Sequence, residues 1–201
     1  MTPSRIGVFG GTFNPPHLGH MLCAQAAVEQ IGLDRLLFVP TAAPPHKEIA
    51  DDPGAEVRAT LVEAAVAGDA RFAVSRLELL RDGPSYTVDT LRDLRAEDPD
   101  RELTLIIGGD MALSFHTWRE PESIVKLARL GVVEREEIDD DTIRRALSGL
   151  GGAQVDYFSM IRCDISSTLV RTRAGAGASL RYLVPEAVAA LIESRQLYRL
   201  S

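Results

Sequence analysis

The feature that most constrains the fold is the alternation of short apolar runs with segments of helical spacing along the chain. The apolar runs predict strands at 6–9, 36–39, 72–74, 103–107, 131–133 and 155–160. The helical spacing predicts helices at 18–31, about 53–67, 86–97, 121–127, 141–147, 167–173 and 186–194. Ser85 is expected to cap the helix at 86–97, and the AGAGA stretch at 174–178 is expected to be a linker between the last two helices. Such alternation is typical of a parallel sheet. We therefore expect an α/β fold: a doubly wound parallel sheet with helices on both faces and a helical C-terminal segment from about residue 166.

Length and composition fit one ordinary globular domain over residues 1–201. Of the 201 residues, 45% are hydrophobic and 25% are charged, which is normal for a globular protein. A chain of this length can bury a hydrophobic core. The formal net charge is −7 and there is no run of Lys and Arg. This balance argues against a general nucleic-acid binder, whereas a nucleotide needs only a few local donors.

The two cysteines, Cys23 and Cys163, lie far apart and form no C-x-x-C pair. They predict neither a disulfide framework nor a structural zinc site, so no metal held by the protein is expected. The N-terminus is too short and glycine-rich for a signal peptide, and no apolar stretch reaches the length of a membrane span. We expect a cytoplasmic protein without membrane contact.

In Rossmann-like sheets, ligands bind beyond the carboxyl ends of strands, near the point where the strand order reverses. The segments in this position are 10–20, 40–48, 108–118 and 162–171. The loop at 40–53 is rich in proline and long enough to suggest a function.

The loop after the first strand reads GGTFNPPHLGH from Gly10 to His20. Paired glycines let the backbone approach a phosphate, and imidazoles at a helix start can donate to phosphate oxygens as charge develops. His17 and His20, at i and i+3, share one face. A tight turn with two surface histidines would explain the glycines, but it would not explain why the two histidines lie three positions apart at a helix start. The predicted nucleotide contacts are Gly10, Gly11, Thr12, Phe13 and Gly19, the last leaving room for a base or ribose.

A second segment, ISSTLVR, runs from Ile165 to Arg171. Ser166 or Ser167 can cap a helix whose free N–H groups face an anion, and Arg171 lies about one turn along. Alone, the segment is equally well read as a capped helix with an exposed arginine. Combined with the first loop, it predicts a second phosphate clamp, in which Ile165, Ser166 and Ser167 contact the phosphates of a nucleotide.

The two segments resemble the H-x-G-H and I-S-S-T-x-x-R signatures of the adenylyltransferase branch of the nucleotidylyltransferase superfamily. Ser85 to Leu91 (SYTVDTL) and Ile107 to Asp110 (IGGD), followed by Trp118, resemble segments of bacterial nicotinate-mononucleotide adenylyltransferases, as does the tail from Tyr182 to Tyr198. Motifs in this order cover nearly the whole chain, which makes the resemblance specific.

The resemblance implies roles for particular residues. Tyr86 and Thr87 would offer backbone groups to a nicotinate carboxylate, and Trp118 would stack on the pyridine ring. Lys47 would contact the substrate phosphate, and Asp110, beside Gly108, would accept hydrogen bonds from the ATP ribose. The alternatives are a core tryptophan, a solvated lysine and an aspartate that caps a helix at 111–115.

The sequence also departs from the family pattern. Asn14 stands where Asp is frequent, and Gly109 stands where Ala is usual. Glu134-Arg135-Glu136-Glu137 replaces the usual Arg-Pro-Gly, which leaves the role of Arg135 open.

The implied reaction is the transfer of the adenylyl group of ATP to nicotinate mononucleotide, giving nicotinate adenine dinucleotide and pyrophosphate. His17, His20 and Arg171 would stabilise the leaving group, and Mg²⁺ would arrive with ATP. Nicotinamide mononucleotide stays an alternative acceptor. Phosphopantetheine is disfavoured by Ser85 to Leu91 and Trp118, and a sensor without turnover by the intact histidine pair. The sequence leaves a homo-oligomer open.

Overall fold

A computed structural model of the chain describes residues 3–44, 49–134 and 140–199. In these residues the strands form one six-stranded sheet, and every neighbouring pair is parallel. The strands are β1 (Arg5–Gly11), β2 (Arg35–Pro40), β3 (Phe72–Val74), β4 (Glu102–Gly108), β5 (Arg129–Glu134) and β6 (Val155–Ser159). The sheet confirms the predicted Rossmann-like α/β fold.

The helices occupy the connections between strands and the C-terminal segment. They are α1 (Leu18–Ile31), α2 (Ala55–Val66), α3 (Thr87–Glu97), α4 (Gly109–Leu113), α5 (Pro121–Leu127), α6 (Asp140–Ser148), α7 (Ser167–Gly175) and α8 (Glu186–Ser194). Two short 3-10 helices, η1 (Leu77–Leu80) and η2 (Phe115–Thr117), were not predicted from the sequence. None of the helices in the described ranges is long and apolar enough to cross a bilayer.

The strand order is β3-β2-β1-β4-β5-β6. The chain therefore moves outward from β1 to β3 and then returns to the other side of β1 with β4. Its order reverses between β1 and β4, where a crevice forms at the carboxyl ends of the strands. The segments that follow β1 and β4, at 12–17 and 109–118, consequently meet at this point.

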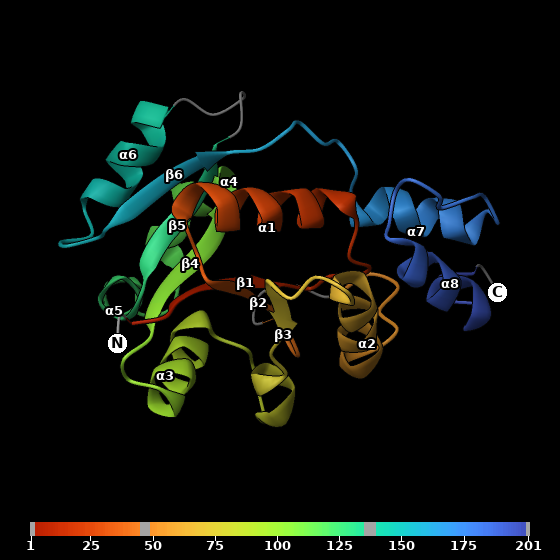
Figure 1. The fold of residues 1–201 in the computed structure, drawn as a ribbon, viewed down its shortest axis with the longest axis horizontal. Helices are drawn as coiled ribbons and strands as arrows, with labels where there is room; N and C mark the ends of the chain where they lie inside the picture. The colour runs from red at the N-terminus through yellow and green to blue at the C-terminus, as the bar shows by residue number, and fades with distance from the viewer. Residues whose placement is uncertain (1–2, 45–48, 135–139, 200–201) are drawn as a thin grey trace.

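Alternating residues of the strands divide the core into two layers. In β4, Leu105 and Ile107 belong to a cluster that includes residues of α3 and α5, whereas Ile106 belongs to the cluster that includes residues of α1. Figure 1 shows α1 and α3 on opposite sides of the sheet. The two buried faces explain why the strands are apolar at nearly every position.

A third apolar cluster joins α2 to the C-terminal helices through Leu61, Val170 and Val188. The backbone N–H of Leu18, at the start of α1, donates to the carbonyl of Leu183 at 2.9 Å. The C-terminal segment is thereby held against the first loop, with α7 and α8 at one end of the molecule (Figure 1).

Several predicted details were wrong. Helix α2 begins at Ala55 rather than near 53, because Asp52 Oδ1 accepts the N–H of Gly54 at 2.9 Å and belongs to the preceding turn. Ser85 does not cap α3, because Tyr86 is the N-cap residue and the Ser85 hydroxyl accepts the N–H of Ala43.

Two further expectations need correction near other helix ends. Asp110 does not cap a helix, since Gly108 is the N-cap residue of α4 and Asp110 lies within its first turn. The AGAGA stretch is not wholly a linker, because α7 continues to Gly175 and Ala174 packs into the third cluster.

Candidate functional site

The two histidines of the first loop lie at the start of α1, with their rings against one another. The ring centroids of His17 and His20 are 3.7 Å apart, with an angle of 34° between the planes. The backbone N–H of His17 donates to Nδ1 of His20 at 3.1 Å. When His20 is neutral, its proton must therefore be on Nε2, which makes Nε2 a hydrogen-bond donor.

Burial keeps both imidazoles neutral near pH 7. It lowers the pKa of His17 to about 4. It also lowers the pKa of His20 well below the ordinary value of 6.5, with a smaller repulsive contribution from His17. The ring of His20 is enclosed by Phe9 and Phe13 as well as by His17. The pair can therefore donate hydrogen bonds to an anion without carrying a charge of its own.

The backbone around the histidines is close-packed. A Cβ atom on Gly19 would lie 3.0 Å from Nδ1 of His17 and 3.3 Å from Sγ of Cys163, so only glycine fits without a shift. Phe13 has a left-handed backbone, with φ of 47°, and is buried. Among the described residues, Nδ1 of His17 is buried without a hydrogen-bond partner. A ligand could supply the missing hydrogen bond at this atom.

The second predicted segment lies directly against the first loop. The hydroxyl of Ser166 accepts the N–H of Leu169 at 3.2 Å, so Ser166 caps α7 as expected. The hydroxyl of Ser167 donates to the carbonyl of Pro15 at 2.9 Å. Ile165 packs against the third apolar cluster. The fold thus brings together the two ends of the predicted nucleotide site.

Arg171, also from this segment, reaches the first loop. Its Nη1 donates to the carbonyl of Asn14 at 3.0 Å, and its Nε lies 3.3 Å from Oδ2 of Asp51. The arginine side chain is only 13% exposed, whereas that of Asp51 is 68% exposed.

A cavity of about 450 Å³ opens where the loops after β1 and β4 meet the start of α3. It collects most of the residues predicted to bind the substrate. Its lining includes Gly10, Gly11, Thr12, Tyr86, Thr87 and Trp118. Trp118 also packs on Phe115, with ring centroids 5.0 Å apart. The indole therefore contributes to the core and to the cavity wall, so the two interpretations of this residue coexist.

Gly108 and Asp110 lie at the carboxyl end of β4, as the sequence predicts. Oδ1 of Asp110 would be 2.6 Å from a Cβ atom on Gly108, so the carboxylate folds over the glycine. Within the described part of the chain, this exposed carboxylate makes no hydrogen bond or ion pair. Lys47 and Arg135 lie outside the described residues.

Sequence reasoning missed a buried arginine beneath the site. Arg58, on α2, is fully buried and donates to the carbonyls of Thr12 at 2.9 Å, Thr41 at 2.6 Å and Ala42 at 3.2 Å. It also forms an ion pair with Asp52 at 2.9 Å. The arginine therefore connects the first loop to the loop after β2. Its place on the apolar face of α2 was the available signal.

A second missed pair involves Asn14 and Tyr198. Asn14 is 2% exposed, and its side chain donates to the carbonyl of Ala50 at 2.9 Å. It also accepts from the hydroxyl of Tyr198 at the end of the chain. No local pattern in the sequence indicates a contact of this kind.

Comparisons with known proteins agree with this arrangement. The cytidylyltransferase-like family matches residues 8–173. The chain is 41% identical to a protein of Shouchella clausii named a probable nicotinate-nucleotide adenylyltransferase, over 96% of each chain. It is also 41% identical to a protein of that name from Pseudomonas paraeruginosa, over 97% of each chain.

Among solved structures, the fold resembles that of Plasmodium falciparum nicotinic acid mononucleotide adenylyltransferase complexed with APC. The TM-score is 0.78, with 15% identity and coverage of 97% of each chain. The same protein complexed with NaAD gives a TM-score of 0.77 with 16% identity. At this level of identity, the likeness concerns the fold.

Proposed function

Because the chain belongs to the nicotinate-nucleotide adenylyltransferases of the cytidylyltransferase-like family, we propose that it transfers the adenylyl group of ATP to nicotinate mononucleotide. The products are nicotinate adenine dinucleotide and pyrophosphate. This reaction would place the protein in NAD biosynthesis.

The observation that carries the proposal is the lining of the cavity between β1 and β4. It joins Trp118, Tyr86 and Thr87 to the glycine turn at Gly10 and Gly11. An indole suits a pyridine ring, and the first N–H groups of α3 suit a carboxylate. A mononucleotide bound this way directs its phosphate toward the glycine turn, while its ring rests on Trp118.

ATP would occupy the adjoining side, between the histidine loop and the start of α7. The base or ribose would lie near Gly19, where His17 and Cys163 leave no room for a side chain, and Asp110 would offer its carboxylate oxygens to the ribose hydroxyls. Ser166, Ser167 and the first turn of α7 lie beside the first loop, where N–H groups at a helix start attract phosphate.

In the reaction, a phosphate oxygen of the mononucleotide attacks the α-phosphorus of ATP. A P–O bond forms, the bond from the α-phosphorus to the bridging oxygen breaks, and pyrophosphate leaves with the electron pair. A phosphate monoester is already ionised near pH 7, so the attack requires no general base. Alignment and stabilisation of the departing charge provide the catalysis.

His17, His20 and Arg171 would supply that stabilisation. The Nε2–H of His20 is available to donate because Nδ1 already accepts from the backbone. Mg²⁺ enters as the Mg–ATP complex and is part of the substrate.

The test is pyrophosphate release by the purified protein with Mg–ATP and one acceptor at a time. We expect release with nicotinate mononucleotide and little with phosphopantetheine. Equal rates with nicotinamide mononucleotide would make the enzyme one of dual specificity. Stable ATP binding without release would support a sensor instead. The His20→Ala variant is the control for contaminating activity.

A further inference from the structure

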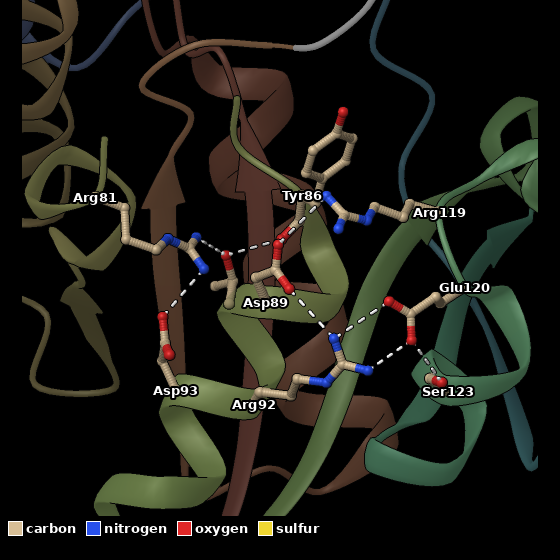
Figure 2. A network of polar contacts seen from close by, with 9 residues as sticks. Arg81, Tyr86, Asp89, Arg92, Asp93, Arg119, Glu120 and Ser123 are labelled. Atoms are coloured by element: carbon tan, nitrogen blue, oxygen red, sulfur yellow. Dashed lines mark hydrogen bonds and ion pairs between the residues drawn. The ribbon is translucent and has the colours of Figure 1, made fainter. Parts of the chain in front are cut away.

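Arg119 is the cationic side chain among the described residues that line the cavity. It follows Trp118 directly and belongs to the segment between η2 and α5. Its guanidinium carbon lies 4.4 Å from the centroid of the Tyr86 ring, and Figure 2 shows the two side chains facing one another. The side chain is 52% exposed. Stacking on Tyr86 restricts the guanidinium to the side of the cavity where α3 begins.

Among the described residues, Arg119 has an ion-pair contact but no hydrogen bond. Its nearest acid is Asp89, whose Oδ2 lies 4.0 Å from Nη1. In the described part of the chain, the guanidinium makes no hydrogen bond. Its donors therefore remain available to a ligand in the cavity.

Arg92, one turn into α3, provides a contrast in the same neighbourhood. Both of its Nη atoms donate to Glu120, at 3.3 and 2.6 Å, and Nη1 also donates to Asp89 at 3.3 Å. Figure 2 shows these contacts on the side of the network away from Tyr86. Arg92 is absent from the cavity lining. The two arginines carry the same charge, but only Arg119 can offer it to a bound substrate.

The cavity contains one acidic side chain within the described residues, that of Glu78. It is 6% exposed, and its Oε1 accepts from the hydroxyl of Thr90 at 2.8 Å. Burial raises the pKa of Glu78. A carboxyl group with a raised pKa takes up a proton more readily when a second anion approaches, which reduces its repulsion of a carboxylate ligand.

We propose that Arg119 determines the preference of the cavity for a pyridine carboxylate over the corresponding amide. The inference rests on the proposed function and adds a specificity-determining residue to it. With the pyridine ring on Trp118 and its substituent toward Thr87, the guanidinium next to Tyr86 is placed to donate to that substituent. A carboxylate accepts charge-assisted hydrogen bonds from both arms of the guanidinium, whereas an amide offers one neutral oxygen and two donors that an arginine cannot accept.

The test compares kcat/KM for nicotinate and nicotinamide mononucleotides in wild type, Arg119→Gln and the matched control Arg92→Gln. We expect Arg119→Gln to lower the acid-to-amide ratio about tenfold, through loss of activity with the acid, because a hydrogen bond to a charged group is worth on the order of this factor. Arg92→Gln should stay within about twofold of wild type. A ratio in Arg119→Gln within twofold of wild type, or an equal fall in both variants, would overturn the proposal.

Arg119→Lys separates charge from shape. It keeps a cation in the cavity but loses the two-armed guanidinium and its stacking on Tyr86, so the acid-to-amide ratio should fall, but by less than in Arg119→Gln. A loss as large as that of Arg119→Gln would contradict the charge-based account.

Calorimetric binding of each mononucleotide makes the inference testable apart from turnover. The Kd of nicotinate mononucleotide should rise about tenfold in Arg119→Gln, while that of the amide is unchanged. A wild-type protein that binds the acid but releases no pyrophosphate would contradict only the proposed function. Unchanged binding of the acid in Arg119→Gln would contradict the inference about Arg119.

Discussion

The hydroxyl of Tyr198 donates a hydrogen bond of 2.8 Å to Oδ1 of Asn14, across a separation of 184 residues. Asn14 belongs to the loop that carries His17, and its own carbonyl accepts from Arg171. Tyr198 has a left-handed backbone, with φ of 63°. The last turn of the chain thus supports the loop expected to bind nucleotide.

Tyr198→Phe should therefore affect both stability and turnover. Oδ1 of the buried Asn14 would lose its donor, at a cost of about 1–2 kcal/mol in the free energy of unfolding. We expect kcat to fall several-fold with a smaller change in KM, because loop alignment rather than binding is disturbed. Urea denaturation and steady-state kinetics measure both effects. Tyr182→Phe is the control, since Tyr182 is 75% exposed, and an equal effect there would contradict the account.

His20→Ala should lower kcat about a hundredfold or more, because it removes a preorganised donor to the departing pyrophosphate. The KM values should change much less. The control is His116→Ala, which alters an exposed histidine on η2. A kcat close to that of wild type in the His20 variant would remove the imidazole from the mechanism.

The low pKa of His17 predicts a pH-dependent stability. The unfolded chain binds a proton at His17 near pH 6.5, whereas the folded protein resists protonation until about pH 4. Between these values the unfolded state holds more protons, so the free energy of unfolding should fall as the pH decreases from 6.5 to 4. The loss attributable to His17 is at most about 3 kcal/mol.

The measurement is the difference in unfolding free energy between wild type and His17→Asn at several pH values from 7 to 4.5. Taking the difference removes the contribution of carboxylates that titrate in both proteins. The advantage of wild type should shrink toward low pH. A constant difference across the range would show that His17 has the same pKa in the folded and unfolded states.

Arg58→Met should strongly destabilise the protein. It leaves the carbonyls of Thr12, Thr41 and Ala42 without this donor and removes the partner of Asp52. Loss of about 3 kcal/mol or more is expected for a buried charged group with these partners. The fluorescence of Trp118 during urea denaturation reports the change. The exposed Arg35, changed to Met, serves as the control, and similar losses in both would be unexpected.

The sequence predicted the order of strands and helices because each element carries its own period of apolar residues. The cap of α7 was predictable for the same reason, since Ser166 and Leu169 lie within one turn. The expected cap of α3 failed because the hydroxyl of Ser85 instead accepts the N–H of Ala43, a residue remote in sequence. Local patterns predict an element well unless a residue distant in sequence forms a hydrogen bond with the side chain that was expected to cap it.

The same limit applies to the candidate site. His17, His20 and Trp118 were found because they belong to recognisable motifs. The roles of Arg58 and Tyr198 depend on backbone carbonyls and an amide that become neighbours only after folding. Arg119 became a candidate only when the cavity placed it beside Tyr86. Residues that hold loops in place or select the substrate are therefore harder to recognise from the local sequence than residues of the reactive motifs.

The pairing of Arg171 with Asp51 has a consequence for nucleotide binding. Arg171, which is expected to bind the triphosphate, already has a counter-ion from the same chain. This is the largely exposed carboxylate of Asp51, 3.3 Å away. An incoming phosphate would therefore replace a carboxylate rather than neutralise a bare cation. Binding becomes an exchange of anions: the phosphate takes the place of the Asp51 carboxylate beside Arg171, and Asp51 returns to solvent. The net electrostatic gain at Arg171 is therefore small. Added salt should accordingly weaken ATP binding in wild type less than in Asp51→Asn, where the arginine has no anion to give up.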